Sequence, residues 1–105
     1  MKTNYFLILF SCFLFSCTTA VFKPTLSDVE YAKTVYPSVT IDELNKGLTL
    51  YANKCGACHQ IFVPNKVSPA IWDAMMPKMK VRAKLEDEEM DLIVKYIKSK
   101  EGKLN

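Results

Sequence analysis

Three residues in one short stretch of the chain have the types and spacing to do chemistry together. Cys55 and Cys58 lie three positions apart in KCGACHQ, and His59, which follows directly, is the only histidine in the sequence. Thiolates and imidazole are the side chains that bind soft and borderline transition metals, and thiolates are also nucleophiles. The stretch therefore indicates a metal site, a redox-active thiol pair or a point of cofactor attachment.

The third of these options is the one that uses all three side chains. A structural zinc site takes four ligands, and a thioredoxin-like thiol pair needs a βαβ frame, whereas the flanking segments are helical in pattern. In a c-type attachment each sulfur adds across one vinyl group of haem, and the histidine reaches the iron. We predict one covalent haem c held by Cys55 and Cys58, with His59 as the proximal ligand. The other ring nitrogen of His59 should donate to a backbone carbonyl. The candidate acceptors are Val63, Pro64 and Pro69.

The opposite axial position of the iron is the second candidate site, and methionine is its candidate ligand. The chain has no second histidine, and a thioether ligand raises the reduction potential, which suits one-electron transfer. We predict Met79, with Met76 as the alternative, because a residue just after a helix break at Pro77 can turn towards the iron. Ligation by Met75, or an open position, is the remaining alternative, since Met75 is expected to pack in the core.

Two amphipathic helices must position these residues. Thr40 and Glu43 form a capping box that predicts the start of a helix running to the cysteines. Residues 85–99 form a second amphipathic helix, with its acidic residues at the start and its lysines at the end. Gly47 lies in the middle of the first helix and indicates a close crossing, for which Tyr96 is the natural partner. The fold class is therefore all-α, with the first and last helices crossing around one haem.

Shorter helices are predicted between and before these two. Ser68 caps a short helix through Trp72 to Met75, which Pro77 ends or kinks. Residues 27–30 cap another short helix that reaches about Lys33. The pattern contains no strands and no internal repeats.

The first residues of the chain resemble an export signal. Residues 5–15, YFLILFSCFLF, are an apolar run behind Lys2 that is too short to span a bilayer. Leu14-Phe15-Ser16-Cys17 resembles a bacterial lipobox, so we predict cleavage before Cys17 and lipidation of that cysteine. Leu9-Phe10-Ser11-Cys12 has the same pattern, but cleavage there would leave too few apolar residues. The alternatives are a retained anchor helix, or a leader that is cleaved elsewhere or kept.

The predicted organisation has three parts. Residues 1–16 form a lipoprotein-type signal peptide, residues 17–37 a lipidated tether with a possible short helix, and residues 38–105 the haem domain. Several acyl chains on one cysteine would make attachment durable. The predicted location is exported, facing the periplasm and anchored by lipid to a bacterial membrane, with the leaflet left open.

With these features in place, the sequence resembles the class I cytochromes c, in particular short monohaem members of lipoprotein type from bacteria. The resemblance spans about residues 39–99. It rests on LNKGLTLYANKC running into CGACH, on Trp72, on Met79 seven residues later, and on LEDEEMDLIVKYI. It implies a helix crossing at Gly47 and Tyr96 and a distal methionine between Trp72 and the last helix. The separation between His59 and Met79 is shorter than in most of that family.

The predicted function is that of an electron carrier and not an enzyme: a membrane-tethered c-type cytochrome passing single electrons between periplasmic or membrane redox partners. A net charge of +3 is too small for a nucleic-acid binder, and no small-molecule substrate is expected. Basic residues near the haem segments suggest a rim for acidic docking surfaces, the alternative being an ordinary solvated face; these are Lys54, Lys66, Lys78, Lys80, Arg82 and Lys84. The alternatives are a gas sensor with an open or displaceable distal site, and a fixed haem subunit of a respiratory complex.

Overall fold

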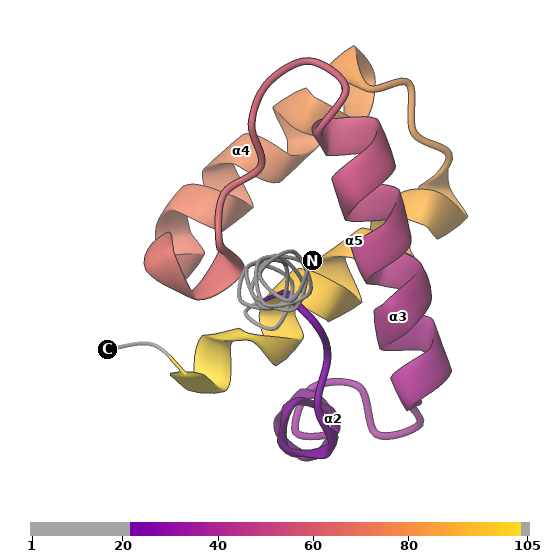
Figure 1. Ribbon diagram of the computed structural model, residues 1–105, viewed down its shortest axis with the longest axis vertical. Helices are drawn as coiled ribbons and strands as arrows, with labels where there is room; N and C mark the ends of the chain where they lie inside the picture. Colours follow the sequence, from indigo (N-terminus) through magenta and orange to yellow (C-terminus); the bar gives the residue numbers. More distant parts are fainter. Residues whose placement is uncertain (1–21, 104–105) are drawn as a thin grey trace, which may run out of the picture.

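The computed structural model describes residues 22–103, and every regular element in that range is helical, which confirms the predicted all-α fold (Figure 1). The predicted signal peptide and Cys17 lie outside the described residues. Among the described residues, no helix is long and apolar enough to cross a bilayer. In chain order the elements are α2 (Leu26–Ala32), α3 (Ile41–Leu50), a π-helical turn (Tyr51–Cys55), a 3-10 turn (Pro64–Lys66), α4 (Pro69–Arg82), α5 (Asp87–Ser99) and a second 3-10 turn (Glu101–Lys103).

The helix α3 begins where the capping box predicts and leads without a break to the first cysteine. The Thr40 hydroxyl accepts a hydrogen bond from the Glu43 N–H at 3.3 Å, and the Glu43 carboxylate accepts one from the Thr40 N–H at 3.0 Å. Past Leu50 the backbone continues as the π-helical turn, which ends at Cys55. Turns of this kind are rare and occur often at functional sites, so this end of the helix is a structural sign of one.

The crossing of α3 and α5 forms the centre of the core (Figure 1). A Cβ atom added at Gly47 would lie 2.7 Å from the Cβ of Tyr96 and would also collide with the carbonyl oxygen of Leu92. Ile93 and Tyr96 are completely buried. Only a glycine lets the two backbones approach this closely, which confirms the predicted contact between Gly47 and Tyr96.

The helix α4 is longer than predicted, because Pro77 does not end it. The helix continues to Arg82, although a proline inside a helix removes one N–H donor and costs about 3 kcal/mol. Pro77 and Asp73, the residue whose carbonyl loses its partner, are both exposed. Water can therefore satisfy that carbonyl, while the burial of Trp72 and Met76 on another side of the helix favours its continuation.

Both ends of α4 are closed by specific hydrogen bonds. At the start, the Ser68 hydroxyl accepts from the Ile71 N–H at 3.4 Å, as predicted. At the end, Lys84 adopts a left-handed backbone conformation with φ 55°, and the Leu85 N–H donates to the Lys80 carbonyl at 3.0 Å. This reversal directs the chain into α5.

The helix α2 begins slightly earlier than predicted and packs against α3 and α5. Its cap is Thr25 and not residues 27–30. The Thr25 hydroxyl accepts from the Asp28 N–H at 3.3 Å, and the Asp28 carboxylate accepts from the Thr25 N–H at 2.8 Å. The buried members of the small core beneath α2 are Val29, Ala32, Val39 and Leu44. Part of the segment assigned to a tether is thus packed, and the domain boundaries stay a prediction.

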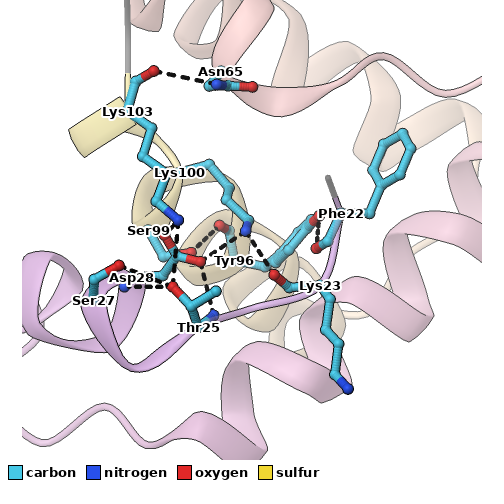
Figure 2. A network of polar contacts seen from close by, with 10 residues as sticks. All are labelled: Phe22, Lys23, Thr25, Ser27, Asp28, Asn65, Tyr96, Ser99, Lys100 and Lys103. Carbon is cyan, nitrogen blue, oxygen red and sulfur yellow. Dashed lines mark hydrogen bonds and ion pairs between the residues drawn. The ribbon is translucent and has the colours of Figure 1, made fainter. Parts of the chain in front are cut away.

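A buried ionic network fixes this N-terminal segment to the end of α5 (Figure 2). Asp28 is 1% exposed, and its carboxylate lies 2.7 Å from the Lys100 ammonium and 3.1 Å from that of Lys103. Lys100 also donates to the Lys23 carbonyl at 2.8 Å. Burial raises the pKa of Asp28, but the hydrogen bonds from Lys100, Thr25 and Lys103 outweigh it and hold that pKa below its ordinary value.

Candidate functional site

The two cysteines of the motif lie at the end of the π-helical turn and just beyond it. Cys55 is half-buried, Cys58 is exposed, and both thiols are free. Burial, and to a smaller extent the neighbouring Cys58, raise the pKa of the Cys55 thiol. Gly56 is the first of the two residues between the cysteines. A Cβ atom at this position would collide with the Ala52 carbonyl oxygen, so the local backbone itself requires a glycine there.

His59 is exposed, and its ring is oriented by its own neighbour in the chain. Its Nδ1 atom lies 2.8 Å from the Gln60 carbonyl oxygen. If Nδ1 carries the proton and donates it there, Nε2 is left free to bind a metal. The predicted acceptors Val63, Pro64 and Pro69 are therefore wrong. The Pro64 carbonyl accepts from the indole N–H of Trp72 at 2.9 Å instead.

The distal methionines come to this site from α4. Met75, Met76 and Met79 all line a cavity of about 20 Å³ that also contacts Cys55 and His59. A second cavity, of about 80 Å³, is lined by both cysteines and His59 together with one of these methionines, Met79. The break at Pro77, on which the choice of Met79 depended, is absent. The position of Met79 on the face of a continuous helix is what brings it beside both cysteines.

Aromatic side chains form the inner wall of the smaller cavity. Tyr51 is 2% exposed and donates from its hydroxyl to the Phe62 carbonyl at 2.5 Å. Its ring meets Trp72 edge-on, with ring centroids 6.1 Å apart. Burial raises the pKa of Tyr51, so the phenol stays protonated. The helical spacing in the sequence predicts that Tyr51 shares an apolar helix face with Cys55, four residues later, but it does not predict the hydrogen bond to Phe62.

The basic residues near the motif do not all face solvent freely. Lys54 and Arg82 line the larger cavity beside the cysteines, and Lys54 lies 3.9 Å from Glu89. Lys80 is paired with Asp87. Five of the six residues of the predicted rim are exposed, and Lys80 is half-buried. A rim for acidic partners stays a prediction.

The donor set fits a covalently attached haem. Two thiols lie at one end of a helix, an imidazole nitrogen is left available, and a thioether lines the same cavity. These are the groups that form the two thioether bonds and the axial bonds of a c-type haem. A zinc centre finds no comparable support, because the described residues contain no group of three or more histidine, cysteine or acidic side chains placed to hold a metal ion.

Comparison with known proteins agrees with this donor set. A family model described as dihaem cytochrome c matches residues 51–105, slightly more than half of the chain. The match supports a c-type cytochrome, as the resemblance implied, but the family is described as dihaem and is not the class I monohaem group. No curated protein and no solved structure shows a significant match.

Proposed function

The chain belongs to the dihaem cytochrome c family, and we propose that it carries single electrons between redox proteins through one haem bound at Cys55 and Cys58. The observation that carries the proposal is the cavity lined by both cysteines, His59 and Met79. Each thiol adds its S–H across one vinyl group of the haem, so attachment consumes no oxidant or reductant. When bound, the haem supplies an iron that alternates between the ferric and ferrous states.

The number of haems per chain is proposed from the attachment chemistry. The family is described as dihaem, but this sequence contains one Cys-x-x-Cys-His motif and one histidine. The two other cysteines, Cys12 and Cys17, precede the described residues and are not followed by a histidine. One attachment motif supports one covalent haem in each chain.

The axial ligands are proposed to be His59 and Met79. The Gln60 carbonyl beside Nδ1 favours the tautomer that leaves Nε2 for the iron, and this contact makes the imidazole a stronger ligand. The three methionines beside the smaller cavity make a thioether ligand more plausible than an open position. With both axial positions occupied, a substrate has no metal site to bind, which supports a carrier and not an enzyme.

Buried aromatic residues line the inner side of this site and orient it. Tyr51 and Trp72 bury their rings and direct their polar atoms to the carbonyls of Phe62 and Pro64. These bonds attach the loop after the motif to the π-helical turn and to α4. A low-dielectric wall disfavours the additional positive charge of ferric iron and so raises the reduction potential.

The proposal also covers how a redox partner docks and where the protein is located. Lys54 and Arg82 beside the larger cavity would present positive charge to an acidic partner surface, which accelerates encounter at low salt. The export signal and the lipidation of Cys17 would keep the carrier at a bacterial membrane, facing the periplasm. The support for this part is the sequence pattern alone.

The experiment is to express the full chain with a c-type haem maturation system and to measure the mass of the mature protein. The mass should show one haem that stays attached in acid-acetone, and an acylated Cys17. The ferric spectrum should contain the weak long-wavelength band of thioether-ligated haem. Met79→Ala should abolish this band, while Met75→Ala and Met76→Ala should keep it. Colourless denatured protein would refute the proposed function, and loss of the band only in Met76→Ala would refute the ligand assignment.

The limited packing of α4 allows the gas-sensor alternative to be tested. Of the four helices in the described range, α4 has the least extensive contact with the others, so the ligand that it carries is the one that can most readily be displaced. Carbon monoxide should leave the spectrum of the ferrous wild-type protein unchanged and should bind to Met79→Ala. Binding to the wild type at comparable affinity would favour a gas sensor.

A further inference from the structure

A third cavity, larger than the two at the motif, lies between α4 and α5. It has a volume of about 320 Å³ and is lined mainly by apolar side chains, among them Met90, Val94 and Ile97 of α5. A volume above about 300 Å³ is in the range of pockets that hold small molecules, whereas the cavities of about 80 and 20 Å³ fall well below it. The sequence analysis did not predict this space.

The three cavities adjoin one another along α4. The two small ones share Cys55, His59 and Met79, and the smallest shares Trp72 and Met76 with the large one. Residues of α4 line all three. Together they therefore extend from the cysteines, past the methionines, to α5.

Trp72 and Met76 are the side chains that line both the large cavity and the smallest one. Trp72 is held by its hydrogen bond to the Pro64 carbonyl. Met76 has an unbranched side chain with several rotatable bonds, which adapts readily to a change in the space around it. A change in the Met76 side chain can thus join the large cavity to the smallest one. The helix α4 can also shift, because it packs less extensively than α3 and α5 do.

We infer that the three cavities are a single slot for the haem, and that the cavity between α4 and α5 receives the half of the macrocycle that carries the propionates. This rests on the proposed function. Covalent chemistry sets the direction, because the vinyl groups and the propionates lie on different pyrrole rings. Once the vinyl side is fixed at Cys55 and Cys58, the propionate side must extend away from them, and the large cavity is the adjoining space in that direction.

The charged side chains that line the large cavity are two lysines and one aspartate. They are Lys80 and Asp73 of α4 and Lys98 of α5. Lys80 is paired with Asp87, and Lys98 lies 2.9 Å from Asp73 and 3.0 Å from Glu101. Asp87 and Asp73 have side chains that are 90% and 66% exposed, so both can return to water if a propionate takes their place, whereas the Glu101 side chain is 14% exposed and stays beside Lys98.

The direct test is nuclear magnetic resonance of the ferrous haem-loaded protein with labelled valine methyl groups. The Val94 methyls should be displaced by the porphyrin ring current and should show contacts to the propionate methylene protons. Val81 is 77% exposed, lines none of the three cavities and serves as the internal control. Val94 methyls that stay at their apoprotein positions, in a protein with attached haem, would overturn the inference. Absence of haem from the mass spectrum would instead overturn the proposed function.

A matched pair of variants provides a second test. Val94→Phe fills the large cavity and should lower the fraction of chains that carry covalent haem several-fold, while Val81→Phe should load as the wild type does. Far-ultraviolet circular dichroism shows whether each apoprotein keeps its helices. A folded Val94→Phe protein that loads fully would mean that the cavity is a separate site for another apolar molecule. If Val94→Phe does not fold, the wild-type resonance measurement decides the matter.

Discussion

Replacing Asp28 by asparagine should lower the free energy of unfolding by about 3 kcal/mol. The Asp28 side chain is 1% exposed, that of Lys100 is 4% exposed, and the two charged atoms lie 2.7 Å apart. Removing one member of a buried ion pair typically costs about 3–5 kcal/mol, because the other charge is left uncompensated. The lower end applies here, since the Lys23 carbonyl still accepts from Lys100 and the more exposed Lys103 can turn to water.

The assay is urea unfolding of the haem-loaded protein at neutral pH, followed by far-ultraviolet circular dichroism. The midpoint should fall while the slope with urea stays unchanged, which identifies a loss of stability. The control is Asp42→Asn, an exposed aspartate in the first turn of α3, which removes the same charge and should cost less than about 1 kcal/mol. Equal losses in the two variants would refute the reasoning from burial.

The wild type and Asp28→Asn together also test the direction of the pKa shift of Asp28. Because the folded-state pKa lies below the unfolded value of about 3.9, the carboxylate contributes stability that is fully present above that value. This contribution is lost as the pH falls through the folded-state pKa. The difference in stability between the wild type and Asp28→Asn should therefore be constant at neutral pH and shrink in acid. A difference that grows in acid would mean that the pKa is raised.

Three further substitutions have expected outcomes that urea unfolding can measure. Gly47→Ala should destabilise the protein by about 1–3 kcal/mol, because the new methyl group collides with Tyr96, and an unchanged midpoint would contradict the crossing. Lys84→Gly should stabilise it by about 0.5 kcal/mol, since glycine adopts a positive φ without strain, and a loss of stability would argue against that backbone conformation. Trp72→Phe should cost about 1–3 kcal/mol, because the buried Pro64 carbonyl loses the indole donor and keeps only the longer bond from the Val67 N–H at 3.4 Å, and a cost below about 0.5 kcal/mol would mean that water replaces the indole.

Local signals in the sequence predicted those parts of the fold that depend on neighbouring residues. Thr40 and Glu43 are three positions apart, and their reciprocal capping bonds form as expected. Gly47 predicted the close crossing because a mid-helix glycine is unfavourable unless something needs the space. Pro77, in contrast, led to a wrong prediction. A proline inside a helix does destabilise it, but the burial of Trp72 favours continuation of the same helix, and that burial cannot be read from the neighbouring residues alone.

The parts that the sequence did not predict depend on residues far apart in the chain or on the phase of a helix. Asp28 and Lys100 are separated by 72 positions, and nothing in either neighbourhood marks them as partners. The preference for Met79 rested on a helix break at Pro77 that is absent, and Met79 as the ligand stays a prediction. With α4 continuous through Pro77, the angular position of each methionine around the helix decides which of them lies beside both cysteines.

The attachment of the N-terminal segment to α5 has a mechanical consequence. The Phe22 carbonyl accepts from the Tyr96 hydroxyl at 2.7 Å, a few residues from the ion pair between Asp28 and Lys100. Tension applied along the chain from its first residues would be borne by α5 and by the α3 backbone packed on it at Gly47. The helix α4 takes no part in these N-terminal contacts, so tension on the first residues would not act directly on the helix that carries Met79.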